Sequence, residues 1–465
     1  MRLHCATIAL LLIGIAFASC QAQQSATEVV DWTTAARIVE RVQPPVFPDR
    51  EFSIASFGGA GDGRKDNTEI FRRAVDSCSA IGGGRVVVPA GVFLTGPIHL
   101  KNNVNLVVSK GATIRFLSDP ARYLPAVFTR WEGVELMNYS ALIYAYGQTN
   151  IALTGDGVLD GQGKPWWPWK GNKETGWSKG MPHQQEARAR LMKMAEENVP
   201  VEKRVFGEGS YLRPNFFQPY RCTNVYVAGV KFVDSPMWFL NPVLCERVLV
   251  DRVTVEGLGP NNDGCNPESS RDVIIRNCIF NTGDDCIAIK SGRNADGRRV
   301  NVPSENIVIQ GCSMKDGHGG VVVGSEASGG VRNVFVEDCV MDSPKLDRSL
   351  RFKTNSVRGG FIENFFARRI TVGEVAEAVV KVDFYYEEGD AGTFVPVMRN
   401  LQVEDLTAKK GEFAFWIKGY ERSKISGLRF TRCRFDGIAK DNVLENVTDV
   451  KAEDVTINGK TFTGQ

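Results

Sequence analysis

From about residue 220 onward, the chain of 465 residues repeats a short pattern of apolar and polar positions. Each copy reads x-φ-x-φ-x-x-φ-x-φ, where φ is apolar, so two alternating runs are separated by two polar residues. Alternation with many β-branched residues predicts short strands. Asn224 opens the first copy, and its apolar positions are Val225, Val227, Val230 and Phe232. Later copies open at Arg247, Asp272, Asn306, Asn333, Asn364, Asn400 and Gly427, with a weaker copy at Asp449.

The spacing of these openings predicts the architecture. Successive openings are 22 to 36 residues apart, which is typical of one coil per copy with loops of varying length inserted. Strands too short to be stable alone, recurring at this period, form a β-solenoid. A propeller would need about four strands per blade and a longer, more regular period. We therefore predict an all-β solenoid that forms a single domain over residues 49–465.

Several cysteines occupy one position of the repeat. Cys278, Cys312, Cys339 and Cys433 each lie six residues after their opening, where other copies have valine, isoleucine or leucine. They are predicted to be small buried hydrophobic residues. Cys222 and Cys245 also share a position, two residues before their openings. Side chains stacked in register point the same way, which favours free thiols over a disulfide between these two.

Two segments interrupt the repeat or precede it. Within residues 52–100 we expect a strand, a helix at 67–80 that ends at three glycines, and a strand at 85–89. This α/β segment would cap the open end of the solenoid. Residues 161–210 are predicted to be an insertion of a loop and a helix (183–198). Its tryptophans either stack on sugar rings or form the loop's own core; they are Trp166, Trp167, Trp169 and Trp177.

The N-terminus has the pattern of a targeting segment. Arg2 precedes an apolar run, Ala6 to Ala18, that is too short to span a bilayer. Residues 1–20 are therefore interpreted as a signal peptide. Cys20 follows small residues, as in a bacterial lipoprotein signal, so a lipid on Cys20 and plain cleavage both stay open. Residues 21–48 are predicted to be a leader or tether. We expect an exported protein, either a periplasmic or outer-membrane-associated lipoprotein or a secreted one.

Composition limits the partners of the protein. The formal net charge is only +2, so no global electric field favours nucleic acid or a membrane surface. A possible lipid on Cys20 is the one membrane contact we expect. An acidic substrate would have to be recognised locally. We expect a monomer, and nothing in the sequence requires a metal or an organic cofactor.

Four short motifs in consecutive copies carry the candidate chemistry: Asn261-Asn262-Asp263-Gly264, Gly283-Asp284-Asp285, Gly317-His318-Gly319 and Arg351-Phe352-Lys353. Aligned by the strand after each motif, Asp263 and Asp285 take one position on neighbouring coils, roughly 5 Å apart. Asp284 then stacks against His318, and the two cations project from the next coil. Adjacent residues of a strand face opposite sides, so Asp284 and Asp285 can converge only at a strand start. Gly283 makes such a bend possible.

This arrangement is suited to glycoside hydrolysis. Three carboxylates in one patch repel each other, so at least one should have a raised pKa and serve as a general acid. An ionised partner would activate water. Inverting enzymes place these two groups roughly 6.5–9.5 Å apart. Arg351 and Lys353 would suit a sugar that carries its own carboxylate.

The four motifs, in this order, resemble those of the polygalacturonases, family 28 of the glycoside hydrolases, over about residues 50–460. The resemblance implies a right-handed parallel β-helix and inverting hydrolysis of α-1,4-galacturonosidic bonds in pectin or oligogalacturonides. It implies that Asp284 is the general acid, that Asp263 and Asp285 share the base role, and that His318 tunes the acid. Arg351 and Lys353 would bind the galacturonate carboxylate. Further substrate-binding candidates are Asn261, Asn266, Lys290, Arg293, Tyr385 and Tyr386.

Departures from the family pattern leave the substrate open. Asn262 stands where threonine is usual and Phe352 where isoleucine is usual, and neither has a charged role. Asn266 stands where an acidic residue is commoner and Cys265 where an apolar one is, and these two lie near the sugar-binding face. The run from Ser291 to Arg293 and the following Gly297-Arg298-Arg299 resemble exo-acting members, so we expect cleavage from a chain end. Three alternatives remain: a calcium-dependent pectate lyase, a hydrolase of branched or rhamnose-containing pectin, and a non-enzymatic binding solenoid.

Overall fold

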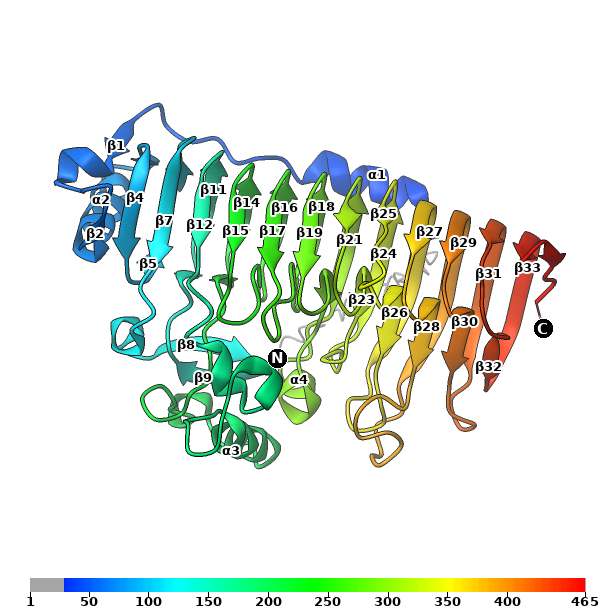
Figure 1. The fold of residues 1–465 in the computed structure, drawn as a ribbon. Helices are drawn as coiled ribbons and strands as arrows, with labels where there is room; N and C mark the ends of the chain where they lie inside the picture. The colour runs from blue at the N-terminus through cyan, green and yellow to red at the C-terminus, as the bar shows by residue number, and fades with distance from the viewer. Residues whose placement is uncertain (1–28, 465) are drawn as a thin grey trace, which may run out of the picture.

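The predicted parallel β-helix is confirmed. The computed structural model describes residues 29–464, and in it the chain winds through successive coils whose strands pair in parallel with those of the next coil (Figure 1). The predicted signal peptide, with Cys20, lies outside the described residues. No helix in the described part of the chain has the length and apolar character needed to cross a bilayer.

Each coil has up to three strands, which stack into three faces. The first face contains β1 (Glu51–Ser53), β3 (Gly84–Val88), β6 (Val104–Val108), β11 (Thr149–Gly155), β14 (Thr223–Ala228), β16 (Glu246–Asp251), β18 (Arg271–Arg276), β21 (Ser304–Gln310) and β24 (Val331–Glu337). The second contains β2 (Asp62–Asp66), β4 (Gly91–Thr95), β7 (Ala112–Phe116), β12 (Val158–Asp160), β15 (Lys231–Val233), β17 (Thr254–Gly257), β19 (Ile279–Thr282), β22 (Ser313–Met314) and β25 (Val340–Met341).

Toward the C-terminus the first two faces merge into long strands, and the third face carries the site described below. The long strands are β27 (Phe361–Glu374), β29 (Val397–Lys410), β31 (Ile425–Phe435) and β33 (Val447–Ile457), with the short β34 (Lys460–Thr461) after them. The third face contains β5 (Ile98–His99), β10 (Ile143–Tyr146), β13 (Phe217–Tyr220), β20 (Ile287–Ile289), β23 (Val321–Val323), β26 (Arg348–Lys353), β28 (Ala378–Asp383), β30 (Phe413–Lys418) and β32 (Val443–Glu445).

The repeat openings mark a fixed backbone turn. Asn306, Asn333, Asn364 and Asn400 all have φ between 56° and 59°. This left-handed conformation is one that asparagine tolerates better than most residues. Their amides also form a ladder: Nδ2 of Asn333, Asn364 and Asn400 each donates to Oδ1 of the asparagine one coil earlier, at 2.7 to 3.1 Å, and Nδ2 of Asn306 donates to Asp272 Oδ1 at 3.0 Å. The ladder locks each coil in register with the previous one.

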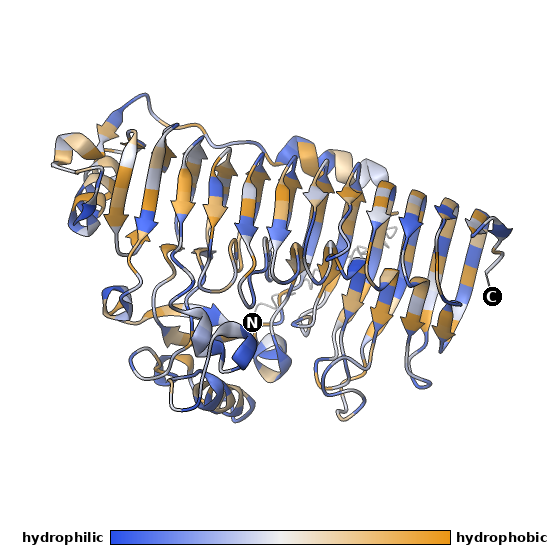
Figure 2. Cartoon of the chain, in the orientation of Figure 1, coloured by the Kyte–Doolittle hydropathy of each residue, from blue (hydrophilic) through white to orange (hydrophobic). Residues whose placement is uncertain are grey.

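The interior is a column of apolar side chains from all three faces, visible as the hydrophobic bands along the strands in Figure 2. The cysteines predicted from the repeat belong to it: Cys278, Cys312, Cys339 and Cys433 are all buried. Cys222 and Cys245 are also buried free thiols, as the register argument favours. Sulfur therefore acts here as a small apolar group.

The N-terminal end of the column is closed by the predicted α/β cap. Helix α2 (Thr68–Ala80) covers it, and its buried side chains belong to the main core, among them Phe71, Val75 and Cys78. Gly82 and Gly83 follow the helix with φ of 94° and 106°, which favours glycine. The chain then enters β3, as expected.

The prediction of a tether up to residue 48 is wrong for its described part. Residues Trp32–Arg41 form helix α1, which lies across the outside of the first face (Figure 1). Its Ala35 and Ile38 pack on a stripe of outward-facing apolar residues, and Arg41 forms an ion pair with Asp272 at 2.6 Å. The stripe comprises Leu249, Ile274, Val308, Phe335 and Phe366, which are partners in successive strands. Burial of this stripe explains why the segment folds onto the solenoid.

The predicted insertion projects beside the third face. It contains short helical turns, η3 (Trp167–Lys170), η4 (Lys173–Thr175) and η5 (Val201–Lys203), and helix α3 (Gln185–Glu196). The helix packs against an antiparallel hairpin, β8 (Val127–Trp131) and β9 (Val134–Asn138), that precedes the insertion in sequence. Helix α4 (Asn294–Val300) lies next to both (Figure 1). These segments form one wall beside the loops of the third face.

Candidate active site

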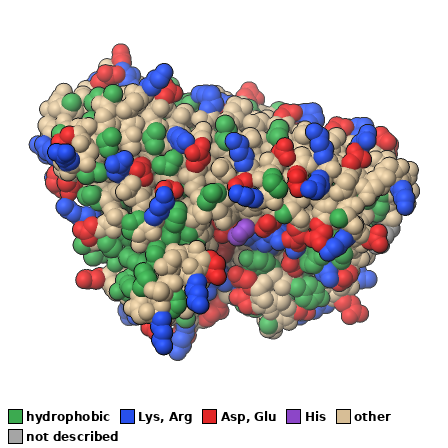
Figure 3. Space-filling model, in the orientation of Figure 1, with side chains coloured by type: hydrophobic (Ala, Val, Ile, Leu, Met, Phe, Trp, Pro, Cys, Tyr) green, Lys and Arg blue, Asp and Glu red, His purple; other side chains and the backbone are tan. Residues whose placement is uncertain are grey.

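The four motifs meet in a charged hollow on the side of the solenoid where the insertion projects. Figure 3 shows acidic and basic side chains gathered in this hollow around a histidine. The cavity has a volume of about 270 Å³. Most of its lining side chains are charged: Glu132, Lys170, Arg188, Asp263, Asp284, Asp285, Lys290, Arg293, His318, Glu326, Arg351, Lys353 and Glu387.

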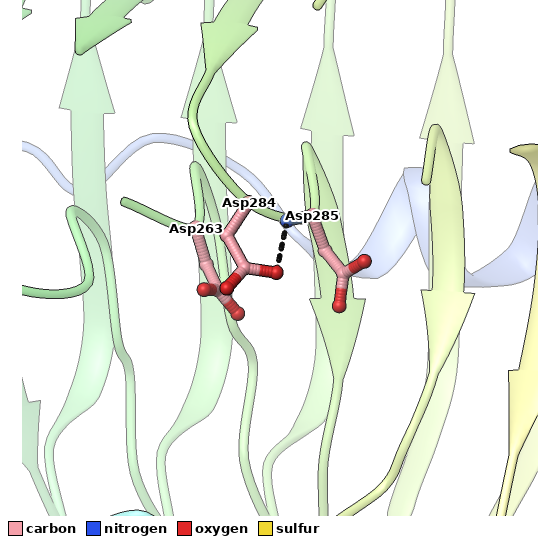
Figure 4. A group of neighbouring side chains, drawn as sticks. All are labelled: Asp263, Asp284 and Asp285. Atoms are coloured by element: carbon pink, nitrogen blue, oxygen red, sulfur yellow. Dashed lines mark hydrogen bonds between the residues drawn. The ribbon is translucent and has the colours of Figure 1, made fainter. Parts of the chain in front are cut away.

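The predicted register of the carboxylates is confirmed. Cys265 pairs with Ile287, so Asp263 and Asp285 occupy the same position on neighbouring coils. Asp284 and Asp285 precede β20, at the strand start that lets both side chains turn to one side (Figure 4). Gly283 is required by close approach, because a Cβ there would lie 2.4 Å from the carbonyl oxygen of Gly259.

Each carboxylate has different partners. Asp263 accepts a hydrogen bond from Asn266 Nδ2 at 2.9 Å, and Lys290 Nζ lies 3.5 Å away. Asp285 accepts one from Arg351 at 3.2 Å and one from Lys353 at 2.7 Å, so both of its oxygens are occupied. This places the two cations next to the triad Asp263–Asp284–Asp285, as the alignment predicts.

Asp284 is the most accessible of the three. Its side chain is 17% exposed, against 3% for Asp263 and 1% for Asp285. Oδ1 accepts hydrogen bonds from His318 Nδ1 and from the backbone N–H of Asp285, both at 3.0 Å. Asn261 Nδ2 donates weakly to Oδ2 at 3.4 Å. A molecule that enters the cavity would therefore contact Asp284 before the other two carboxylates.

Comparison with known proteins identifies the family. The description Glycosyl hydrolases family 28 matches residues 207–452 of the chain. The chain belongs to this family. The crystal structure of a hyperthermoactive exopolygalacturonase from Thermotoga maritima is 46% identical, with a TM-score of 0.91, and the alignment covers 94% of this chain and 98% of that one. The resemblance predicted from the four motifs is thus confirmed, and the protein is a glycoside hydrolase.

More distant relatives of this family-28 hydrolase also have names that refer to galacturonan. The exo-poly-alpha-D-galacturonosidase of Dickeya chrysanthemi is 26% identical over 463 residues, covering 88% of this chain and 75% of that protein. A probable polygalacturonase of Vitis vinifera is 27% identical over 409 residues, covering 84% and 76%.

The surroundings of the family-28 site shift the pKa values of Asp263 and Asp284 in opposite directions. Burial, together with the charge of Asp284, raises the pKa of Asp263 to about 7, although Lys290 opposes the shift. Burial would also raise the pKa of Asp284, but the hydrogen bond from His318 and the charges of His318, Lys353 and Lys290 bring it below its usual value. The prediction of at least one raised pKa is met by Asp263, whereas the resemblance assigns the acid role to Asp284.

The three carboxylates of the triad lie close together. One oxygen from each of the three carboxylates lies within 4.8 Å of the others. Inverting glycosidases usually separate acid and base by roughly 6.5–9.5 Å. The 4.8 Å limit refers to one oxygen of each carboxylate, whereas the usual range refers to the two carboxyl groups, so this close contact does not contradict the inverting outcome that the resemblance implies.

Most of the predicted binding residues line the cavity, and two do not. Asn261, Lys290, Arg293 and Tyr386 face it, with the Tyr386 ring 5.6 Å from the Arg351 guanidinium and 5.2 Å from Lys353 Nζ. Tyr385 instead points away and packs edge-on against Tyr420. Asn266 is fully buried behind Asp263, which it positions.

Several residues that line the cavity lie outside the four motifs and were not predicted from the sequence. Glu132 comes from the turn of the β8–β9 hairpin, and Lys170 and Arg188 come from the insertion. Arg188 forms an ion pair with Glu132 at 2.7 Å, which ties the insertion to the hairpin. The sequence indicated an inserted loop and helix but not these contacts. The other missed residues are Trp238, Ser325, Glu326 and Glu387.

The insertion's tryptophans form a loop core and do not line the cavity. Trp166 is buried with its ring 4.9 Å from that of Trp169 and 5.6 Å from that of Tyr123. Trp177 packs against His183. The cavity is lined by a different tryptophan, Trp238. Of the two interpretations left open by the sequence, the structure supports self-packing.

The raised pKa of Asp263 predicts a pH-dependent gain in stability for Asp263→Asn. A carboxyl with a pKa of about 7 in the folded protein and an ordinary value of 3.8 keeps a proton that the unfolded chain releases. Wild-type stability therefore falls as pH rises from about 4 to 7, while the amide does not titrate. Thermal unfolding should show Asp263→Asn gaining up to a few kcal/mol over this range, at about 1.4 kcal/mol per pKa unit.

The matched variant is Asp285→Asn, which should be destabilised because Arg351 and Lys353 lose their shared buried partner. A constant difference between Asp263→Asn and wild type at every pH would contradict the assignment of the proton to Asp263.

Proposed function

We propose that the protein hydrolyses α-1,4-galacturonosidic bonds of polygalacturonate from a chain end. The observation that carries this proposal is the carboxylate triad placed directly beside Arg351 and Lys353. Three acids supply the groups for glycosidic cleavage, and two cations with Tyr386 supply a binding place for a sugar carboxylate. The names of the family-28 relatives, polygalacturonases and exopolygalacturonases, support the same substrate.

Chain-end action is supported by the wall at one side of the site. A solenoid face is open along its axis, so an unobstructed groove would admit a long polymer. Here the β8–β9 hairpin and the insertion contribute Glu132, Lys170 and Arg188 to the cavity lining. The ion pair between Arg188 and Glu132 holds these two segments together. A cavity closed in this way favours binding of a terminal sugar.

In the proposed mechanism Asp284 protonates the glycosidic oxygen, because it is the most accessible carboxyl of the triad. Without substrate, burial raises the pKa of Asp263 and the hydrogen bond from His318 lowers that of Asp284, which favours the proton on Asp263. A galacturonate carboxylate that binds Arg351 and Lys353 cancels part of the positive charge that keeps Asp284 ionised. The proton then passes to Asp284, and the ionised Asp263 activates the attacking water with Asp285.

Export is a separate proposal. The basic start at Arg2, the short apolar run from Ala6 to Ala18 and the small residues before Cys20 support a cleaved signal. Pectin lies outside the cell that digests it, so export fits the proposed substrate. Mass spectrometry of the N-terminal peptide from the native host would show whether residue 20 is the mature N-terminus and carries a lipid; an intact Met1 would contradict export.

Polygalacturonate digested in the presence of a chelator should release monomer or dimer from the earliest time points. The products should be saturated, which separates hydrolysis from elimination by a calcium-dependent lyase. Asp284→Asn should lower kcat by roughly 10²- to 10⁴-fold, the usual contribution of a general acid. The exposed Asp441→Asn is the matched control and should keep wild-type activity. A descending ladder of long oligomers would overturn chain-end action, and unsaturated products would overturn hydrolysis.

The stereochemical outcome should be inversion, as the family resemblance implies. Proton NMR of a fresh digest should then show the new reducing end first as the β-anomer, because the substrate linkage is α. Mutarotation afterwards produces the α-anomer, so early time points are needed. First appearance of the α-anomer would establish retention instead.

A further inference from the structure

The insertion brings to the cavity one cation that the proposed mechanism does not use. Lys170 ends η3, and its Nζ donates to Asn261 Oδ1 at 2.7 Å. Arg213, a fully buried residue, donates from Nη2 to the same oxygen at 2.8 Å. Within residues 29–464 neither cation forms an ion pair with a carboxylate. The other lysines and arginines that line the cavity do, namely Arg188, Lys290, Arg293, Arg351 and Lys353.

The loop core of tryptophans explains why Lys170 sits where it does. Trp167 Nε1 donates to the carbonyl of Ser235 at 2.9 Å. Its ring lies so close to Gly259 that a Cβ at that glycine would be 2.2 Å from the ring. Trp166 and Trp169 pack against each other directly beside it. The turn that bears Lys170 is therefore fixed to the coil that carries Asn261 and Asp263.

Lys170 lies on the opposite side of the triad from Arg351 and Lys353. It contacts Asn261, which precedes Asp263 on the earlier of the two catalytic coils. The other two cations project from β26, which lies two coils after β20 along the stacking order. The two positive groups thus bracket the carboxylates along the solenoid axis. A galacturonan chain carries one carboxylate on every sugar, so the two sugars that flank a cleaved bond present two of them.

We propose that Lys170, held by Asn261 and the tryptophan core, binds the carboxylate of the sugar on the enclosed side of the cleaved bond. Arg351 and Lys353 bind the sugar on the other side. This inference rests on the proposed function. It attributes to the insertion the selectivity of the enzyme for a terminal sugar that carries a carboxylate. A charge-assisted hydrogen bond in a water-poor cavity is stronger than one in solvent.

The electrostatic setting supports this assignment. Burial lowers the pKa of Lys170, although Glu132 partly offsets the effect. Burial also lowers the pKa of Arg213 to about 10. Two partly desolvated cations beside one amide oxygen repel each other, so an anion at Lys170 stabilises both. The nearby Glu132 does not fill this place, because Arg188 binds it.

The test uses the shortest oligogalacturonide that the wild type cleaves and two analogues of it. Each analogue carries a methyl ester on only one of the two sugars that flank the cleaved bond, which removes one carboxylate charge. Wild-type kcat/KM should fall roughly 10- to 100-fold for each ester. With the unmodified substrate, Lys170→Met should show a similar loss of kcat/KM relative to the wild type. With one of the two esters, the kcat/KM of this variant should fall no further. Lys353→Met should become insensitive to the other ester.

Two further variants keep the experiment decisive. Lys173→Met changes an exposed lysine of the same insertion and should retain the wild-type pattern for all three substrates. Asn261→Asp places a carboxylate beside Lys170, so it should remove the same ester discrimination while leaving the lysine in place. If Lys170→Met and Asn261→Asp, shown to be folded by circular dichroism, still discriminate against both esters as the wild type does, the proposal is overturned. Failure of the wild type to cleave any oligogalacturonide would instead refute the proposed function.

Discussion

Everything in this structure depends on the in-register stacking of coils. The turn at each repeat opening has a left-handed backbone, and the amide ladder from Asn306 to Asn400 fixes each coil against the previous one. Because of this stacking, two residues separated in sequence by the length of one coil lie next to each other in space. Asp263 and Asp285 become adjacent because they take one position in consecutive coils, and the cations of β26 reach them because they lie two coils further along the same face.

The site is built from buried charges, whose removal from water costs free energy, and most of them are paired. Asp285 is held by Arg351 and Lys353, while Lys290 is shared between Asp263 and Glu326. Removing one member of such a pair leaves an uncompensated buried charge, which is strongly destabilising. The pairs also have a catalytic use, because charges already in position need not reorganise when a bond breaks.

The sequence predicted what the repeat determines. Residues that take the same position in neighbouring coils lie next to each other in space. This rule predicts the register of Asp263 with Asp285, the contact of Asp284 with His318 and the burial of the cysteines. Helix α1 was not predicted, although the outward position between two apolar ones is itself apolar in Leu249, Ile274, Val308, Phe335 and Phe366, which indicates that something covers this face. The lining residues Glu132, Lys170 and Arg188 were not predicted either, since they lie in segments whose positions depend on tertiary packing. Nor could the sequence assign the proton to Asp263, which depends on burial and on the distances to Asp284 and Lys290.

The regular coils and the segments that depart from the repeat have different roles in this enzyme. A regular coil can place acid, base and cations, but it cannot close its own groove, because every coil offers the same open side to the next. Only a departure from the repeat can end the groove, and here the hairpin and the insertion do so together through Glu132 and Arg188. The tryptophans then have a structural reason to be numerous. Trp166 and Trp169 pack on the main core of the solenoid as well as on each other, and Trp167 contacts the coil that carries Asp263, so together they fix the end wall to the solenoid.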